Sequence, residues 1–108
     1  MTTTVKKLYQ GKPAEVNQNA YVANGKTIVK NISLCNTLDT AGSHITLYVA
    51  PEGTNPTEEH ALLYRYAVKE HSTDVIDTNL VLEKGERIVM SQRHATAISV
   101  RISGVGVE

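Results

Sequence analysis

Short stretches in which apolar and polar residues alternate one by one constrain the fold of this chain more than any other feature. The clearest is Ile45-Thr46-Leu47-Tyr48-Val49, which ends at the turn-forming run Ala50-Pro51-Glu52-Gly53. Successive side chains of a strand point to opposite faces of its sheet, so the three aliphatic residues share one face. Thr46 and Tyr48 then lie on the other face. The pattern indicates a small antiparallel β-domain in which each sheet has one solvent-exposed face.

Similar stretches recur about every ten residues, the rhythm of a sandwich or barrel. We predict six to eight strands, over residues 5–9, 20–22, 27–36, 45–49, 62–69, 75–82, around 88–90 and 97–102. Val, Ile and Thr supply 31 of the 108 residues, and β-branched side chains favour strands. No predicted helix is long enough to cover a sheet, so a second sheet must do so. We therefore expect residues 1–108 to form a single all-β domain, an antiparallel, jelly-roll-like β-sandwich.

Turn signals add detail between these strands. The fold class allows at most one short helical turn, which we place at residues 55–58 with Asn55 as its N-cap. Residues 39–43 are predicted to form a loop. Gly104 and Gly106 are expected to loosen the end of the last strand.

Two local irregularities are expected near the start of the chain. Asn24-Gly25 is the strongest signal for a two-residue hairpin in the sequence. In the following strand, Ile28, Ile32 and Leu34 are assigned to one face. Lys30 interrupts that set, which predicts a bulge or a rim position there.

Candidate chemistry is sparse. A zinc site needs closely spaced soft ligands, but the four histidines lie far apart in the sequence and Cys35 is the only cysteine. There is no Gly-x-Ser-x-Gly motif and no phosphate-binding loop. We therefore predict no catalytic residue, no metal site and no cofactor. A cupin-type enzyme is an alternative that requires at least two histidines to converge on one metal, from the set His44, His60, His71 and His94.

The charge balance bears on the choice of partner. Eleven basic residues offset eleven acidic ones, which argues against nucleic acid or an anionic membrane as the partner. No stretch approaches 18 consecutive apolar residues, and the N-terminus lacks an apolar signal core. These features predict a protein made and kept in a cytosol unless it leaves as part of a larger particle.

Tyr64 and Tyr66 are the candidate contact residues. They stand two positions apart in a predicted strand and are therefore assigned to one face. Neighbouring tyrosines can form a platform for a sugar or a single nucleic-acid strand. More often they pack between sheets or at a subunit contact, and the zero net charge further disfavours nucleic acid.

A family resemblance carries most of the functional prediction. The run Thr3-Thr4-Val5-Lys6-Lys7-Leu8-Tyr9-Gln10-Gly11-Lys12-Pro13, together with residues 20–37, 45–51, 81–88 and 100–105, resembles small structural proteins of tailed phages that infect Gram-positive bacteria. The resemblance implies a compact β-sandwich related to the shoulder domain of siphophage receptor-binding proteins, the part that anchors a tail fibre to its baseplate. It offers no catalytic motif, so no residue receives a catalytic role.

The resulting hypothesis is a non-enzymatic phage structural or accessory protein that acts through protein–protein contacts as a tail-, baseplate- or virion-associated module. Its expected partners are other phage structural proteins, with homo-oligomers allowed. Its expected location is the host cytoplasm during assembly, and a location in the virion is left open beside a role outside it. A capsid decoration protein and a carbohydrate-binding module that recognises cell-wall sugar through Tyr64 and Tyr66 are the alternatives.

Overall fold

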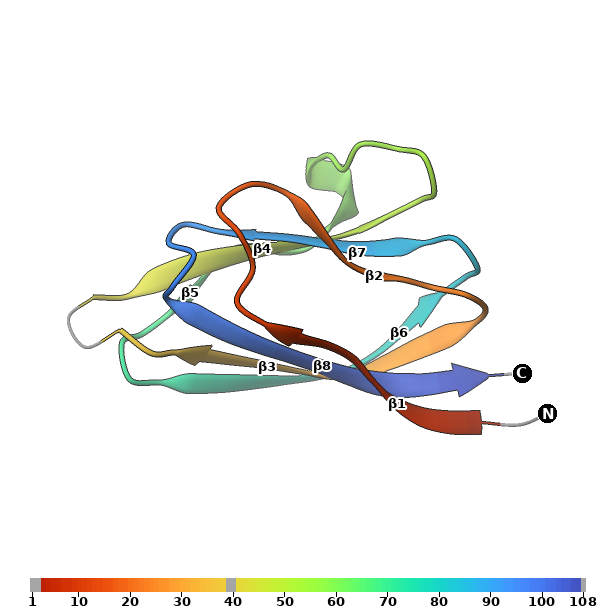
Figure 1. The fold of residues 1–108 in the computed structure, drawn as a ribbon, viewed down its shortest axis with the longest axis horizontal. Coiled ribbons are helices and arrows are strands. Elements are labelled where there is room, and N and C mark those ends of the chain that lie inside the picture. Colours follow the sequence, from red (N-terminus) through yellow and green to blue (C-terminus); the bar gives the residue numbers. More distant parts are fainter. Residues whose placement is uncertain (1–2, 39–40, 108) are drawn as a thin grey trace.

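The computed structural model describes residues 3–38 and 41–107 of the chain. Within them, eight strands and one 3-10 turn account for the regular structure (Figure 1). No helix in the described part of the chain is long and apolar enough to cross a membrane. The elements are β1 (Thr3–Gly11), β2 (Gln18–Val22), β3 (Thr27–Asn36), β4 (Ser43–Ala50), η1 (Glu58–His60), β5 (Ala61–Val68), β6 (Thr73–Leu82), β7 (Arg87–Gln92) and β8 (Ile98–Val107).

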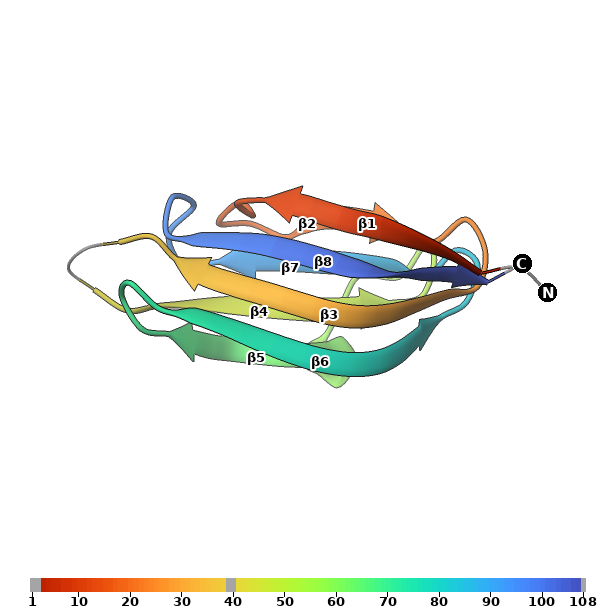
Figure 2. The same cartoon turned by 90° about the horizontal axis from the view of Figure 1, so that it is seen from below.

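The strands form two four-stranded antiparallel sheets. The first sheet has the order β1-β8-β3-β6 and the second has the order β2-β7-β4-β5. The first half of the chain pairs with the second half in reverse order, β1 with β8, β2 with β7, β3 with β6 and β4 with β5. Rolling up such a nested set of pairs produces a jelly roll of eight strands in two sheets. The predicted all-β, jelly-roll-like sandwich is therefore confirmed. Figure 1 shows the two sheets one above the other, and Figure 2 shows the first sheet in front of the second.

The core lies between the two sheets and is aliphatic. Every second side chain of a strand points inward, and most of the described buried residues are apolar. The buried polar residues are Thr27, Asn36, Ser43, Thr46 and Gln92. In the last strand, Ile98, Val100 and Ile102 point inward and are each at most 1% exposed. The largest fully buried side chains are Ile32, Leu34, Ile45, Leu47, Leu82, Ile88, Met90, Ile98, Ile102, Val29, Val68 and Val100.

The predicted hairpin at Asn24-Gly25 is wrong. β2 pairs with β7 in the second sheet, whereas β3 pairs with β6 and β8 in the first, so these residues carry the chain from one sheet to the other. Neither residue has the positive φ that a two-residue type I′ hairpin turn requires. Instead, the backbone of Ala23 bonds to Glu86 and Gly85 in the turn between β6 and β7.

The predicted bulge at Lys30 is confirmed, and it corrects the assignment of faces in β3. The register of β3 shifts between Val29 and Asn31 against both neighbouring strands. The extra residue reverses the alternation, so Val29 rather than Ile28 points inward with Ile32. Ile28 consequently lies on the outer face of the first sheet.

The helical turn exists but begins later than predicted. Thr57, not Asn55, is the N-cap of η1, and its backbone N–H donates to His60 Nδ1 at 3.0 Å. Two residues of the predicted loop 39–43, Asp39 and Thr40, lie outside the described residues.

Gly104 does not loosen its strand, because β8 continues to Val107. A Cβ atom at Gly104 would overlap the backbone carbonyl of Ile28, so the glycine allows β3 and β8 to approach closely.

Candidate functional site

The outer face of the second sheet carries a groove with a volume of about 250 Å³. We call it the basic groove because two arginines and one histidine line it against a single carboxylate. Its lining residues are Glu15, His44, Thr46, Tyr48, Tyr64, Arg65, Ser91, Gln92 and Arg93.

Strand β4 forms the floor of the basic groove. Its outward positions are His44, Thr46 and Tyr48, which alternate with the buried Ile45 and Leu47. On the β7 side, Ser91 pairs with Thr46. The backbone N–H of Arg93 donates to the carbonyl oxygen of His44 at 3.1 Å. The residue that follows β7 therefore still lies beside β4 at this end of the sheet.

A β-bulge in β5 forms the opposite side of the basic groove. Ile45 pairs with Tyr66 and Leu47 with Leu63, so two residues of β5, Tyr64 and Arg65, oppose Thr46 alone. Arg65 has φ +49°, a left-handed conformation that is uncommon for a residue other than glycine. Its backbone N–H donates to Thr46 Oγ1 at 3.1 Å, and Thr46 is only 8% exposed. A partly buried hydrogen bond therefore stabilises the bulge.

The bulge also overturns the assignment of Tyr64 and Tyr66 to one face. Tyr64 is 47% exposed and lines the basic groove, whereas Tyr66 packs against the hydrophobic core. The Tyr66 hydroxyl donates to Asp74 Oδ2 of β6 at 3.0 Å. That hydrogen bond, with burial and the charge of Asp74 adding to it, raises the pKa of Tyr66. Tyr66 thus packs against the core, as the favoured interpretation had it, and the alternative of a two-tyrosine platform is not formed. A contact role for either residue stays a prediction.

Tyr64 is held from two directions. Its hydroxyl donates to Glu58 Oε1 of η1 at 3.2 Å. The guanidinium carbon of Arg65 lies 5.5 Å from the centroid of its ring, within the range of a cation–π contact. The ring therefore forms one wall of the basic groove, although it is largely exposed.

Gln92 fixes the loops beside the basic groove. Its side chain is 3% exposed, and its Nε2 donates to the carbonyl oxygen of Pro13 at 2.8 Å. The same amide exchanges hydrogen bonds with Ile98, whose N–H donates to Gln92 Oε1 at 2.9 Å. The loop that contributes Glu15 and the turn after β7 are thus tied to one buried side chain.

The electrostatics of the basic groove centre on His44. Partial burial lowers the pKa of His44, and the nearby positive charges of Arg93, Arg65 and His94 lower it further. Strand β4 runs between β5 and β7, so Arg65 and Arg93 lie on opposite sides of β4, Arg93 beside His44 and Arg65 opposite Thr46. Among residues 3–38 and 41–107, neither arginine has an acidic partner within 4.0 Å.

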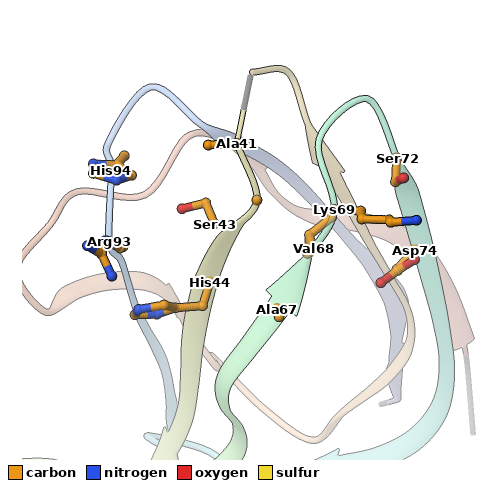
Figure 3. Close-up of a pocket in the computed structure, with 11 residues that line it drawn as sticks. Ala41, Ser43, His44, Ala67, Val68, Lys69, Ser72, Asp74, Arg93 and His94 are labelled. Carbon is orange, nitrogen blue, oxygen red and sulfur yellow. The ribbon is translucent and has the colours of Figure 1, made fainter. Parts of the chain in front are cut away.

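A second, larger hollow of about 690 Å³ lies at the end of the sandwich and shares His44 and Arg93 with the basic groove. Figure 3 shows His44 pointing toward the segment that carries Arg93 and His94, with Lys69 and Asp74 on the far side. We call it the end hollow; it also includes Ala41, Gly42, Ser43, Ala67, Val68 and Ser72.

The structure brings together two of the four histidines, since His44 and His94 both line the end hollow. His60 lies in η1, and His71 lies in the turn between β5 and β6. In the described part of the chain, no group of three or more His, Cys, Asp or Glu residues is placed to hold a metal ion.

The outer face of the first sheet carries a different feature, which the sequence analysis did not identify. Val5 pairs with Val105, Val105 with Ile28, and Ile28 with Val81, so the four side chains cross the whole sheet in one line. We call this set the apolar row. Val5 is 83% exposed and Val81 is 47% exposed. The Lys30 bulge, which turns Ile28 outward, is the sequence signal that could have revealed it.

No family model, no curated protein and no solved structure matches this chain.

Proposed function

We propose that this protein is a non-enzymatic phage structural or accessory protein that acts through protein–protein contacts, as a tail-, baseplate- or virion-associated module. The jelly roll is compatible with this proposal, because viral capsid and lectin domains use such double-sheet folds. The family resemblance supplies the phage context.

The apolar row is the observation that carries the proposal. Four β-branched side chains are aligned across a sheet face where alternation would ordinarily place polar residues. Burying apolar surface contributes about 25 cal/mol per Å², so covering the row would stabilise a complex. A contiguous apolar strip on a sheet suits a neighbouring structural subunit better than it suits a polar ligand.

The region next to the apolar row is polar. Lys7, Ser103, Asn31 and Asp77 lie in the next line across the sheet, and Asn31 Nδ2 donates to Asp77 Oδ1 at 3.0 Å. An apolar strip bounded by hydrogen-bonding groups resembles the core and rim of a protein interface. The proposed partner is therefore another phage structural protein that covers this end of the first sheet.

Mass spectrometry of virions from the phage that encodes the chain tests the proposed location. The expected result is that the protein copurifies with particles in a constant ratio to a known structural protein. Its absence from particles would rule out the virion-associated role. The position of the gene would decide between a tail component and a capsid decoration protein, since structural genes of one part are commonly neighbours.

Changing the apolar row tests the contact surface. We expect Val5→Lys with Val81→Lys to abolish incorporation into particles, because two charges would have to be desolvated in the interface. Stability should change little, since both side chains are exposed. Val16→Lys is the matched control, because Val16 is 73% exposed but lies in the loop between β1 and β2. Normal incorporation of the double variant would contradict the assignment.

The carbohydrate-binding alternative through Tyr64 and Tyr66 has weaker support, because the two rings do not share a face. Glycan binding that persists in the Tyr64→Ala and Tyr66→Ala variants would refute that site.

A further inference from the structure

We propose that the basic groove binds a sugar or related polyol that carries a negatively charged group, a phosphate or a carboxylate. This activity goes beyond the proposed protein contacts and uses the opposite sheet. It differs from the carbohydrate-binding alternative because the site includes Tyr64 without Tyr66 and requires a negative charge on the ligand. It depends on three features of the groove, which are its charges, its aromatic and hydroxyl groups, and its rigidity.

The charges favour an anion. Arg65 and Arg93 flank β4 from two sides, and neither guanidinium is neutralised by an acidic partner among the described residues. The planar donor fork of arginine matches carboxylate and phosphate oxygens better than an ammonium group does. Glu15 is the single carboxylate in the lining, and its Oε2 already accepts the N–H of Ala95 at 3.3 Å. Both arginines line the basic groove, so an anion bound there has two guanidinium groups available to it.

The remaining lining groups suit a polyol. Tyr48 and Tyr64 provide ring surface for the apolar faces of a sugar, and their hydroxyls and that of Ser91 can exchange hydrogen bonds with sugar hydroxyls. Sites for drug-sized ligands occupy roughly 300–1,000 Å³. The basic groove, at about 250 Å³, is the size of a site for a single ring or a short polyol.

The groove is also rigid where it would contact the ligand. Thr46 Oγ1 holds the backbone of Arg65, Glu58 holds the Tyr64 hydroxyl, and Gln92 fixes the flanking loops. Left-handed backbone at a residue other than glycine is costly and collects at functional sites. A preorganised site loses less conformational entropy when it binds its ligand.

An NMR titration of the ¹⁵N-labelled protein tests the proposal with four probes: glucose 6-phosphate, glucuronate, glucose and inorganic phosphate. We expect the first two to shift the amide signals of His44, Arg65 and Arg93 saturably at millimolar concentrations. Glucose and inorganic phosphate should each bind at least about tenfold more weakly, because each lacks half of the recognised chemistry. A response to only one of the first two would identify the charged group as phosphate or carboxylate and would support the proposal.

Two variants and a control complete the test. Arg93→Gln, and separately Arg65→Asn, should each weaken binding about tenfold, the loss of one charge-assisted hydrogen bond. Asn is chosen at Arg65 because it tolerates a left-handed backbone. Arg101→Gln, an exposed arginine on the other sheet, should bind like the unchanged protein. No saturable shift with either charged sugar, equal binding of inorganic phosphate alone, or unchanged affinity in both groove variants would each overturn the proposal.

Discussion

The outer face of the first sheet presents the apolar row, and the outer face of the second sheet presents the basic groove. Both faces belong to four-stranded antiparallel sheets with the same inward alternation of aliphatic residues. In each, a bulge changes which side chains face outward at the feature described. The bulge at Lys30 turns Ile28 outward into line with three valines, and the bulge at Tyr64 and Arg65 brings both side chains to the groove. Each bulge shifts the alternation locally while the core stays aliphatic, so bulges decide which side chains this sandwich presents to partners.

The largest effect that separates the two faces is expected from Gln92→Leu. The change leaves the carbonyl of Pro13 and the N–H of Ile98 without their buried partner, which should cost about 2–4 kcal/mol in the free energy of unfolding. Chemical denaturation measures this cost. Asn31→Leu on the other face should cost about 0.5 kcal/mol or less, because its partner Asp77 is exposed to water. Equal costs for the two variants would contradict the view that the buried amide of Gln92 stabilises the loops beside the basic groove.

Gly104→Ala should affect the first sheet, which carries the apolar row. The new Cβ would overlap the carbonyl of Ile28, and the backbone must move, at an expected cost of about 1–3 kcal/mol. Amide shifts should be concentrated in β3 and β8, next to the apolar row, while His44 in the groove stays unchanged. Gly25→Ala is the control, because nothing lies within 4 Å of its Cβ position and its φ is not positive. A Gly104→Ala protein as stable as the Gly25→Ala protein would show that the close approach is not required.

The smallest expected effect is on the titration of His44. Arg93→Gln should raise the pKa of His44, because one of the positive charges that lower it is removed. Since the folded state lowers this pKa, the stability gained from neutral His44 is complete above pH 6.5. That stability is lost as the pH falls through the folded-state pKa. NMR titration of the His44 ring gives the pKa directly, with Arg101→Gln as control. An unmoved pKa would show that Arg93 does not face His44.

Much of the fold could be predicted from the sequence, for a physical reason. Period-two alternation is imposed residue by residue, so the strands, the inward faces of the last strand and the sandwich architecture could be recognised. The position of Lys30 among aliphatic residues even indicated a bulge. The assignment of Ile28 to the inward face was wrong, because one inserted residue reverses the inward and outward assignments of all residues on one side of the bulge.

The candidate site was much less predictable. Strict alternation would put Tyr66 on the same face as Tyr64 and Arg65 on the opposite face. In the structure, Arg65 lines the basic groove with Tyr64, and Tyr66 packs against the core. Nothing in the local sequence requires a left-handed arginine, because the bulge depends on Thr46 of a neighbouring strand. The approach of Arg93 and Arg65 to His44 likewise depends on sheet order. The phage resemblance did not bear on either surface.

That this chain forms strands with one apolar face follows from local alternation and β-branched composition, which can be recognised without knowing the partner strand. Which strands are neighbours, and that Asn24-Gly25 crosses between sheets, is known from the three-dimensional fold alone. The same holds for the meeting of Tyr64 with Arg65 on the groove face and for the four aliphatic residues that form one row. The reason is that strand order and register arise from contacts between distant segments, whereas alternation belongs to each segment alone.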